Sequence, residues 1–196
     1  MTASGDQLRP NRPLGNKAFA LALFAVAALQ SAALGWMIND RVSLLNSGRQ
    51  IVLNTVPVDP RSLFRGDYVI LNYAISTFKP QSLGGDDDFK RGMPVFVTLR
   101  KSYRARWQPV AVTSAYPAET PKDQVVIRAI VRSAGKTLRV NYGIESYFVP
   151  EGEGKKLEQL VRQSELQVMV AIGTNGEAAI KGLIVDGKVQ YEEPLF

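Results

Sequence analysis

The sequence predicts a mainly β protein, with antiparallel sheets in a barrel-like or sandwich-like arrangement and one short packed helix, preceded by a single N-terminal transmembrane helix. Two observations carry this prediction. Residues 18–38 form one uncharged apolar run, and the rest of the chain is a series of short β-branched segments bounded by turn residues. At 196 residues the chain has room for one domain besides an anchor. We therefore expect a tail at residues 1–17, a helix with its extension at 18–47, and a β-rich domain at 49–196.

The apolar run has the length of a membrane span. Its 21 residues contain no charge and are interrupted only by Gln30, Ser31 and Gly35. At about 1.5 Å per residue a helix over this run covers about 30 Å, whereas the apolar part of a cleaved signal peptide has about 7 to 15 residues. The length favours an uncleaved signal anchor. The small residues Ser31-Ala32-Ala33 leave cleavage open as the alternative.

Basic residues on one side of the run predict its orientation. Arg9, Arg12 and Lys17 precede the apolar residues, with only Asp6 against them. Since basic flanks stay in the cytoplasm, we expect a cytoplasmic N-terminus in the inner (cytoplasmic) membrane and a periplasmic, or more generally extracytoplasmic, C-terminal domain.

The composition excludes several kinds of chemistry. The chain has no cysteine and no histidine. The lack of cysteine rules out disulfides and thiolate nucleophiles, and the lack of histidine rules out Ser-His-Asp and Cys-His catalysis. We expect no metal and no cofactor.

The net charge of +6 includes one dense basic stretch with interleaved aromatic residues. It consists of Lys90, Arg91, Arg100, Lys101, Arg104 and Arg106 with Tyr103 and Trp107. Such a stretch could hold nucleic acid or anionic headgroups. Because Val95, Val97 and Leu99 place the apolar residues on one side, we interpret it instead as the solvated edge of a sheet, and we expect no nucleic-acid partner.

The apolar period predicts the order of elements after the membrane span. The helix is expected to continue through residues 40–47 and to stop at Gly48. Strands are expected at residues 51–58 and 67–74, which should pair, and the loop at 78–92 has no apolar period and should be mobile. The next strands are expected at residues 94–101, 107–113, 125–132 and 137–142.

Turn residues predict where strands reverse. Residues 133–136, Thr174-Asn175-Gly176 and Asp186-Gly187 should each join two antiparallel strands, because Asn-Gly and Asp-Gly steps are strong hairpin signals. The one helix expected inside the domain covers residues 153–164, whose apolar residues recur on a single face.

One segment has a distinctive local pattern. Asp59 can cap a single helical turn that begins at Pro60 and ends at Gly66, after which a strand begins. Arg61 and Arg65 stand four residues apart on that turn, with Asp59 and Asp67 at its two ends. The simpler interpretation is a surface ion-pair network. The alternative is a recognition patch in which two guanidinium groups bind a carboxylate, a phosphate or a partner's loop.

The residues Gly66-Asp67-Tyr68, Leu71 and Tyr73 resemble the pattern that names the GDYXXLXY family of bacterial membrane-anchored proteins. Residues 57–61 and 143–152, including Tyr147 and Glu151, are also similar, so the resemblance extends from about residue 41 to the end of the chain. It implies a single anchor, a mostly β domain outside the cytoplasm and association with a multi-spanning membrane protein. The family has no established reaction, so no catalytic residue is carried over. The binding residues we expect are Asp59, Arg61, Arg65, Gly66, Asp67, Tyr68, Leu71, Tyr73, Tyr147 and Glu151.

Two functions therefore remain open. The first is a non-catalytic binding or assembly module for a membrane partner. The second is a histidine-independent hydrolase of envelope material that uses a Ser-x-x-Lys pair, Ser76 and Lys79, or carboxylates such as Asp67, Glu145 and Glu151. The acidic run at residues 86–88 lacks the donor spacing of a calcium loop, and we interpret it as solvated.

Overall fold

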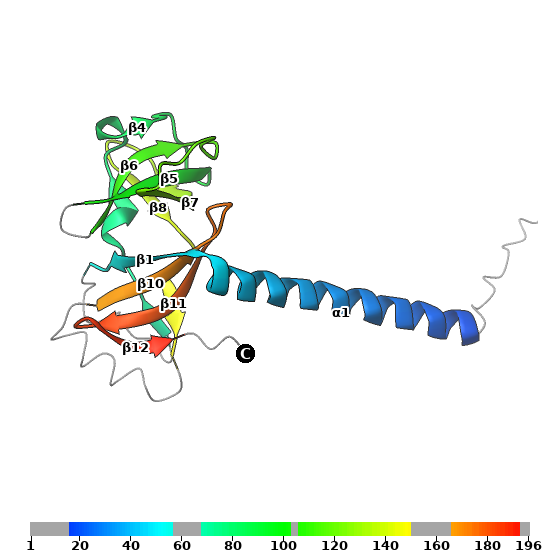
Figure 1. Cartoon of the computed structure of the whole chain (residues 1–196). Coiled ribbons are helices and arrows are strands. Elements are labelled where there is room, and N and C mark those ends of the chain that lie inside the picture. The colour runs from blue at the N-terminus through cyan, green and yellow to red at the C-terminus, as the bar shows by residue number, and fades with distance from the viewer. Residues whose placement is uncertain (1–15, 57–67, 103–105, 150–165, 193–196) are drawn as a thin grey trace, which may run out of the picture. The chain divides into compact units, whose positions relative to one another are not determined.

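The computed structural model describes residues 16–56, 68–102, 106–149 and 166–192, and the helix predicted at residues 153–164 lies outside them. The chain divides into two units, residues 1–41 and 42–196. Helix α1 (Asn16–Ser47) contains the predicted apolar run (Figure 1). Among the described residues it is the one helix long and apolar enough to cross a membrane, and its apolar window is fully exposed to the surroundings. A membrane anchor is the role that fits such a helix.

The predicted helix stop at Gly48 is confirmed. The Gly48 N–H donates to the Leu44 carbonyl oxygen at 2.9 Å, and β1 (Arg49–Asn54) begins at the next residue. A Cβ on Gly48 would clash with the Leu44 carbonyl oxygen and lie 3.2 Å from the Cβ of Ala171. Leu45, in the last turn of the helix, is buried. The end of α1 is therefore part of the packed domain, and glycine is required for the close approach of the chain.

One sheet of the domain has four strands in the order β1-β10-β11-β12, all antiparallel. Its other strands are β10 (Leu166–Ile172), β11 (Ala178–Val185) and β12 (Lys188–Glu192). The two hairpins predicted here are confirmed. Gly176 has a φ of 81°, and Asp186 and Gly187 have φ of 48° and 75°. Positive φ at both central residues is what a two-residue hairpin turn needs, and it explains the Asp-Gly step.

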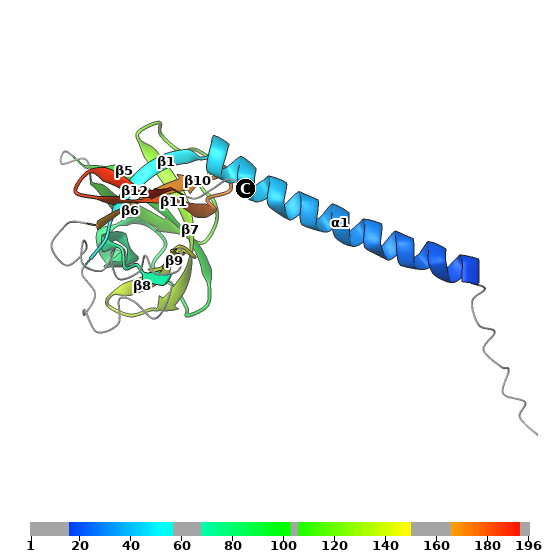
Figure 2. The same ribbon diagram turned by 90° about the horizontal axis from the view of Figure 1, so that it is seen from below.

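The second sheet has six strands in the order β3-β8-β7-β5-β6-β4, in which only the short β4–β6 pair is parallel. Figure 2 labels β5, β6, β7 and β8 of this sheet. Predicted and observed bounds coincide for β5 (Pro94–Lys101) and β6 (Trp107–Thr113), and nearly coincide for β7 (Gln124–Ser133) and β8 (Leu138–Asn141). The edge strands β3 (Thr77–Phe78) and β4 (Gly84–Gly85) are short. Two single-turn helices, η1 (Ala74–Ser76) and η2 (Pro80–Ser82), stand beside β3.

One core joins the two sheets. Alternate residues of β5, β7, β10 and β11 are buried in a single apolar cluster, to which Val97, Ile127, Val168 and Leu183 belong. Burying one such side chain stabilises the fold by about 1.5–3 kcal/mol, so the cluster is the main source of stability. A polar tie adds to it, because the Arg49 guanidinium at the start of β1 donates to the carbonyls of Lys122 and Gln124 at 2.6 and 2.7 Å.

The expected pairing of residues 51–58 with residues 67–74 is limited, among the described residues, to an isolated bridge between Thr55 and Tyr73 and a hydrogen bond from the Val56 N–H to the Asn72 carbonyl. The longer ladders are formed elsewhere. β1 pairs with β10, and β2 (Tyr68–Ile70) pairs with β9 (Ser146–Phe148) in a separate two-stranded ribbon. β1 and β2 are adjacent in the sequence, but each forms its longer ladder with a strand from a distant part of the chain.

The interpretation of the basic stretch as a sheet edge is also wrong for β5. This strand lies between β7 and β6, with ladder partners on both sides. Val95, Val97 and Leu99 are buried as predicted, and Arg100 and Lys101 are exposed at the end of the strand. The charges are solvated because they lie at the sheet's end, and Arg104 lies outside the described residues.

Candidate functional site

Residues 69–75, most of which belong to the strand predicted at residues 67–74, alternate between the core and the surface, as the sequence predicts. Val69, Leu71, Tyr73 and Ile75 are buried, with Leu71 only 1% and Tyr73 only 2% exposed, whereas Asn72 is exposed. Successive side chains of an extended chain point to opposite sides. The named positions of the motif beyond Tyr68 are therefore part of the core.

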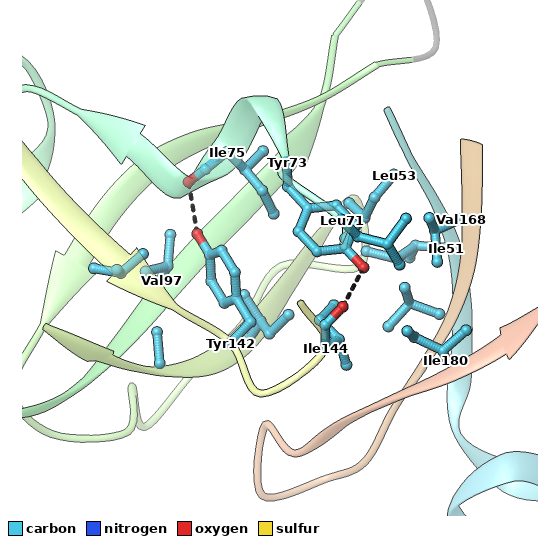
Figure 3. Packing of buried hydrophobic residues seen from close by; sticks show 14 of the residues in the cluster. Ile51, Leu53, Leu71, Tyr73, Ile75, Val97, Tyr142, Ile144, Val168 and Ile180 are labelled. Carbon is cyan, nitrogen blue, oxygen red and sulfur yellow. Dashed lines mark hydrogen bonds between the residues drawn. The ribbon is translucent and has the colours of Figure 1, made fainter. Parts of the chain in front are cut away.

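Two tyrosines join residues 71–75 to the turn that follows β8. The Tyr73 hydroxyl donates to the Ile144 carbonyl at 2.6 Å, and the Tyr142 hydroxyl donates to the Ile75 carbonyl at 2.7 Å. Each segment thus supplies one tyrosine to a carbonyl of the other (Figure 3). We call the two segments, residues 71–75 and 142–145, the tyrosine clasp. All four bonding groups belong to buried residues, so the clasp satisfies two carbonyls that water cannot reach.

Glu145 completes the clasp. Its carboxylate accepts the backbone N–H groups of Tyr142 and Gly143, the latter at 3.0 Å. Its own carbonyl accepts the Leu71 N–H at 2.9 Å. Gly143 has a φ of 81°, a conformation open to glycine, which lets the chain turn back so that the carboxylate can reach these amides. Glu145 therefore holds the turn, since each of its carboxylate oxygens accepts one backbone N–H.

The two clasp tyrosines are proton donors that do not titrate near neutral pH. Burial, and secondly the negative charge of Glu145, raise the pKa of Tyr73 and of Tyr142 well above the usual value of 10. Both hydroxyls consequently keep their protons and their hydrogen bonds. These groups have a structural role, because both tyrosine hydroxyls and the Glu145 carboxylate already bond to backbone groups.

The β2–β9 ribbon lies next to the clasp. Its register places Tyr68 opposite Phe148, Val69 opposite Tyr147 and Ile70 opposite Ser146. Residues 57–67 join the described fold at Tyr68, and residues 150–165 follow one residue after the end of β9. In an antiparallel pair these two ends are neighbours. The two segments expected to bind a partner therefore attach at the same end of one ribbon.

The expected binding residues fall into two groups. Leu71, Tyr73 and Tyr147 are buried, so their side chains support the ribbon from the core side. Tyr68 takes part in β2 through its backbone. The remaining residues lie outside the described part of the chain, namely Asp59, Arg61, Arg65, Gly66, Asp67 and Glu151.

Sequence reasoning missed the pairing of the clasp. It treated Glu145 as a candidate carboxylate of a hydrolase and Tyr73 as a binding residue. The available signal was Gly143, because glycine readily adopts the positive φ that a tight turn requires. Nothing in the sequence indicates that Tyr73 and Tyr142 reach each other's segments.

The Ser-x-x-Lys pair is not assembled in the structure. Ser76 is the last residue of η1, and its buried hydroxyl oxygen has no hydrogen-bond partner among the described residues, so it is not bonded to Lys79. Lys79 is exposed. Glu145 is the one carboxylate of the proposed acid/base set that the structure describes, and it bonds to backbone amides.

The acidic run at residues 86–88 is exposed, as the interpretation of a solvated loop predicts, and it is also tied to the rest of the domain. One carboxylate oxygen of Asp86 accepts both the backbone N–H and the hydroxyl of Ser114 at 2.7 Å, and Phe89 is buried. These bonds lower the pKa of Asp86 below its usual value. Across the described ranges there is no group of three or more His, Cys, Asp or Glu side chains that could hold a metal ion.

Comparison with known families places the clasp and the ribbon in a wider group. The GDYXXLXY protein family matches residues 30–183. The chain belongs to the GDYXXLXY family. No curated protein and no solved structure matches it. The match begins inside α1 and ends in β11, so it includes both halves of the clasp and both strands of the ribbon.

The structure explains two positions of the GDYXXLXY pattern. The leucine is Leu71, which is buried, and the final tyrosine is Tyr73, whose hydroxyl holds the Ile144 carbonyl. A shorter apolar residue at position 71 would leave a cavity, and a phenylalanine at position 73 would leave a buried carbonyl without its donor. These two positions of the GDYXXLXY pattern thus describe a packing requirement.

Proposed function

We propose that this protein is a single-pass, membrane-anchored binding or assembly module. In this proposal α1 crosses the inner membrane with its N-terminus in the cytoplasm. The β-rich domain lies on the periplasmic, extracytoplasmic side and contacts a multi-spanning membrane protein without catalysing a reaction. Arg9, Arg12 and Lys17 support this orientation, because basic flanks stay in the cytoplasm.

The observation that carries the proposal is the register of the β2–β9 ribbon. Because Tyr68 lies opposite Phe148, residues 57–67 and residues 150–165 attach side by side to one rigid base. Phe148, at that end of the ribbon, is 76% exposed, so a large apolar ring lies at the surface there. A ribbon anchored by the buried Val69 and Tyr147, with two chain segments attached at one end, is an arrangement that suits a recognition surface.

The chemistry of the attached segments suits binding. Arg61 and Arg65 supply guanidinium groups that can donate paired hydrogen bonds to a carboxylate or phosphate, and Asp59, Asp67 and Glu151 supply acceptors of opposite charge. The clasp beneath has no uncommitted hydroxyl or carboxylate, because both tyrosines and Glu145 bond to backbone groups. A binding role therefore uses this region as it is built, whereas catalysis by Tyr73, Tyr142 or Glu145 would have to break the clasp.

The interaction can be tested by purification in a mild detergent. The full chain should co-purify with a multi-spanning membrane protein, and Arg61→Ala with Arg65→Ala should reduce its recovery at least tenfold, since a charged hydrogen-bonded contact is worth about 1.5–3 kcal/mol. Lys136→Ala with Lys188→Ala removes the same charge from exposed positions and should leave recovery unchanged. Purification of the chain alone, or an equal loss in both double variants, would contradict the proposal.

The orientation can be tested separately. Alkaline phosphatase fused after Phe196 should be active and a green fluorescent protein fused there should be dark, since each reporter folds correctly on a different side of the membrane. The reverse result would place the domain in the cytoplasm.

A further inference from the structure

The six-stranded sheet carries positive charge that no carboxylate in its strands balances. Its strands contain Arg100, Lys101, Arg128, Arg132 and Arg139 and no Asp or Glu. The strands of the four-stranded sheet, by contrast, include Glu192 beside their basic residues. An excess of one sign on one sheet is a feature of a charged surface, not of the fold.

Three of these arginines share one face of β7 and β8. In β7, Arg128, Ile130 and Arg132 are exposed while the residues between them are buried. In β8, Arg139 is exposed between the buried Leu138 and Val140. Ile130 lies opposite Asn141, and Ser133 opposite Arg139, so the exposed residues of both strands are on the same side. We call Arg128, Ile130, Arg132 and Arg139 the arginine face.

The guanidinium groups of Arg128, Arg132 and Arg139 make no hydrogen bond and no ion pair within the part of the chain that the structure describes. At a rise of about 3.3 Å per residue, Arg128 and Arg132 stand about 13 Å apart along β7. Ile130, which is 53% exposed, lies between them. The face thus combines spaced cations with an apolar centre.

We propose that the arginine face binds the anionic headgroups of the phospholipid bilayer. Guanidinium groups donate paired hydrogen bonds to phosphate, and an apolar side chain among them can enter the headgroup boundary. The inference rests on α1 as a membrane anchor and does not need the proposed protein partner.

The short stretch of chain between the apolar run and β1 favours a lipid surface as the ligand of the arginine face. The apolar run ends at residue 38, α1 ends at Ser47, and β1 starts at Arg49. The helical residues from the end of the apolar run to the end of α1 cover only about 14 Å, and the last of them already pack in the domain. A tethered domain meets the lipid surface at a high effective concentration, so even weak attraction is effective. Each basic residue near an anionic surface contributes on the order of fivefold to binding.

The full chain can be tested after reconstitution into nanodiscs, in which the scaffold protein is the only other protein. Because the chain has no cysteine, Ile130→Cys introduces a single site for an environment-sensitive fluorophore. Val189→Cys on β12 is a matched reference, since Ile130 and Val189 are both 53% exposed. The emission at position 130 should shift to the blue when phosphatidylglycerol is added to phosphatidylcholine, and high salt should reverse the shift. The emission at position 189 should not change.

Charge variants identify the source of the shift. In the Ile130→Cys chain, replacing Arg128, Arg132 and Arg139 by glutamine should abolish it. Replacing Lys122, Lys181 and Lys188 by glutamine removes the same net charge elsewhere and should retain it. The salt reversal is measured in the chain that keeps its arginines. It therefore tests the proposal even if the triple glutamine variant does not fold.

The proposal would be overturned by an equal shift in neutral and anionic discs, by a shift at position 189, or by a shift that survives loss of the arginines. A polyglutamate peptide that shifts the emission at position 130 in neutral discs, when phosphatidylglycerol does not, would also overturn it and would indicate an acidic protein partner. Failure of the detergent purification, with this shift present, would count against the partner alone.

Discussion

Removing one hydroxyl from the tyrosine clasp tests whether the GDYXXLXY pattern is a packing requirement. In Tyr73→Phe the ring still fills its place in the core, but the Ile144 carbonyl loses a donor that lies at 2.6 Å. Because Tyr73 is 2% exposed, water does not replace that donor. Leaving a buried acceptor unsatisfied costs about 1–3 kcal/mol, so we expect the free energy of unfolding to fall by that amount.

The reciprocal bond gives a second, linked measurement. Tyr142→Phe removes the donor to the Ile75 carbonyl and should destabilise the domain by a similar amount, about 1–3 kcal/mol. Since both bonds join the same two segments, the first loss loosens the second bond. The double variant should therefore lose less than the sum of the single variants, by at least about 0.5 kcal/mol.

The assay is urea unfolding of the full chain in detergent, followed by near-ultraviolet circular dichroism of the aromatic residues. Tyr116→Phe is the matched control, because Tyr116 is 41% exposed and its ring contacts Phe96 edge to face, which the substitution keeps. It should change stability by less than about 0.5 kcal/mol. If Tyr73→Phe unfolds at the same urea concentration as the unchanged chain, or if the two losses simply add, the clasp is not a cooperative structural unit.

Three further outcomes are expected. Gly48→Ala should destabilise the domain by about 1–3 kcal/mol because its methyl group would meet a backbone oxygen of α1, whereas Gly135→Ala, with nothing within 4 Å, should be neutral in the same urea assay. The raised pKa values of the clasp tyrosines mean that the folded state holds its protons longer than the unfolded state. The contribution of these tyrosines to stability should therefore be constant well below pH 10 and then fall by up to about 1.4 kcal/mol per pH unit per tyrosine as the pH rises above 10, a slope that the double phenylalanine variant lacks in alkaline titrations. Asp86→Asn should speed amide exchange at Ser114, measured by hydrogen exchange, whereas Asp87→Asn should not; equal effects would show that the acidic loop is not held by this bond.

Local sequence signals predicted the single elements well. β5 and β6 begin and end where turn residues bound their β-branched runs, and α1 stops at the glycine that the apolar period indicated. The Asp186-Gly187 hairpin follows from the need for positive φ at both central residues. These features depend on residues a few positions apart, so one sequence is enough to find them.

Pairing between distant segments could not be predicted in the same way. The pattern of β1 shows which of its faces is buried, but not that its ladder partner is β10, more than a hundred residues later. The same holds for β2 and β9. Alternation determines a face, whereas any strand with a compatible face can serve as a partner, and the choice depends on how the whole core packs.

The sequence by itself determined an apolar helix long enough for a bilayer, a β-rich domain after it, and a chain without histidine or cysteine, because length, period and composition are local properties. Only the tertiary structure decided what the motif tyrosine does. Tyr73 and Tyr142 each bond a carbonyl about seventy positions away in the chain, and their burial raises the pKa of both. A hydrogen bond of this kind exists only once two sheets have closed around it, since its strength comes from the exclusion of water by the folded core.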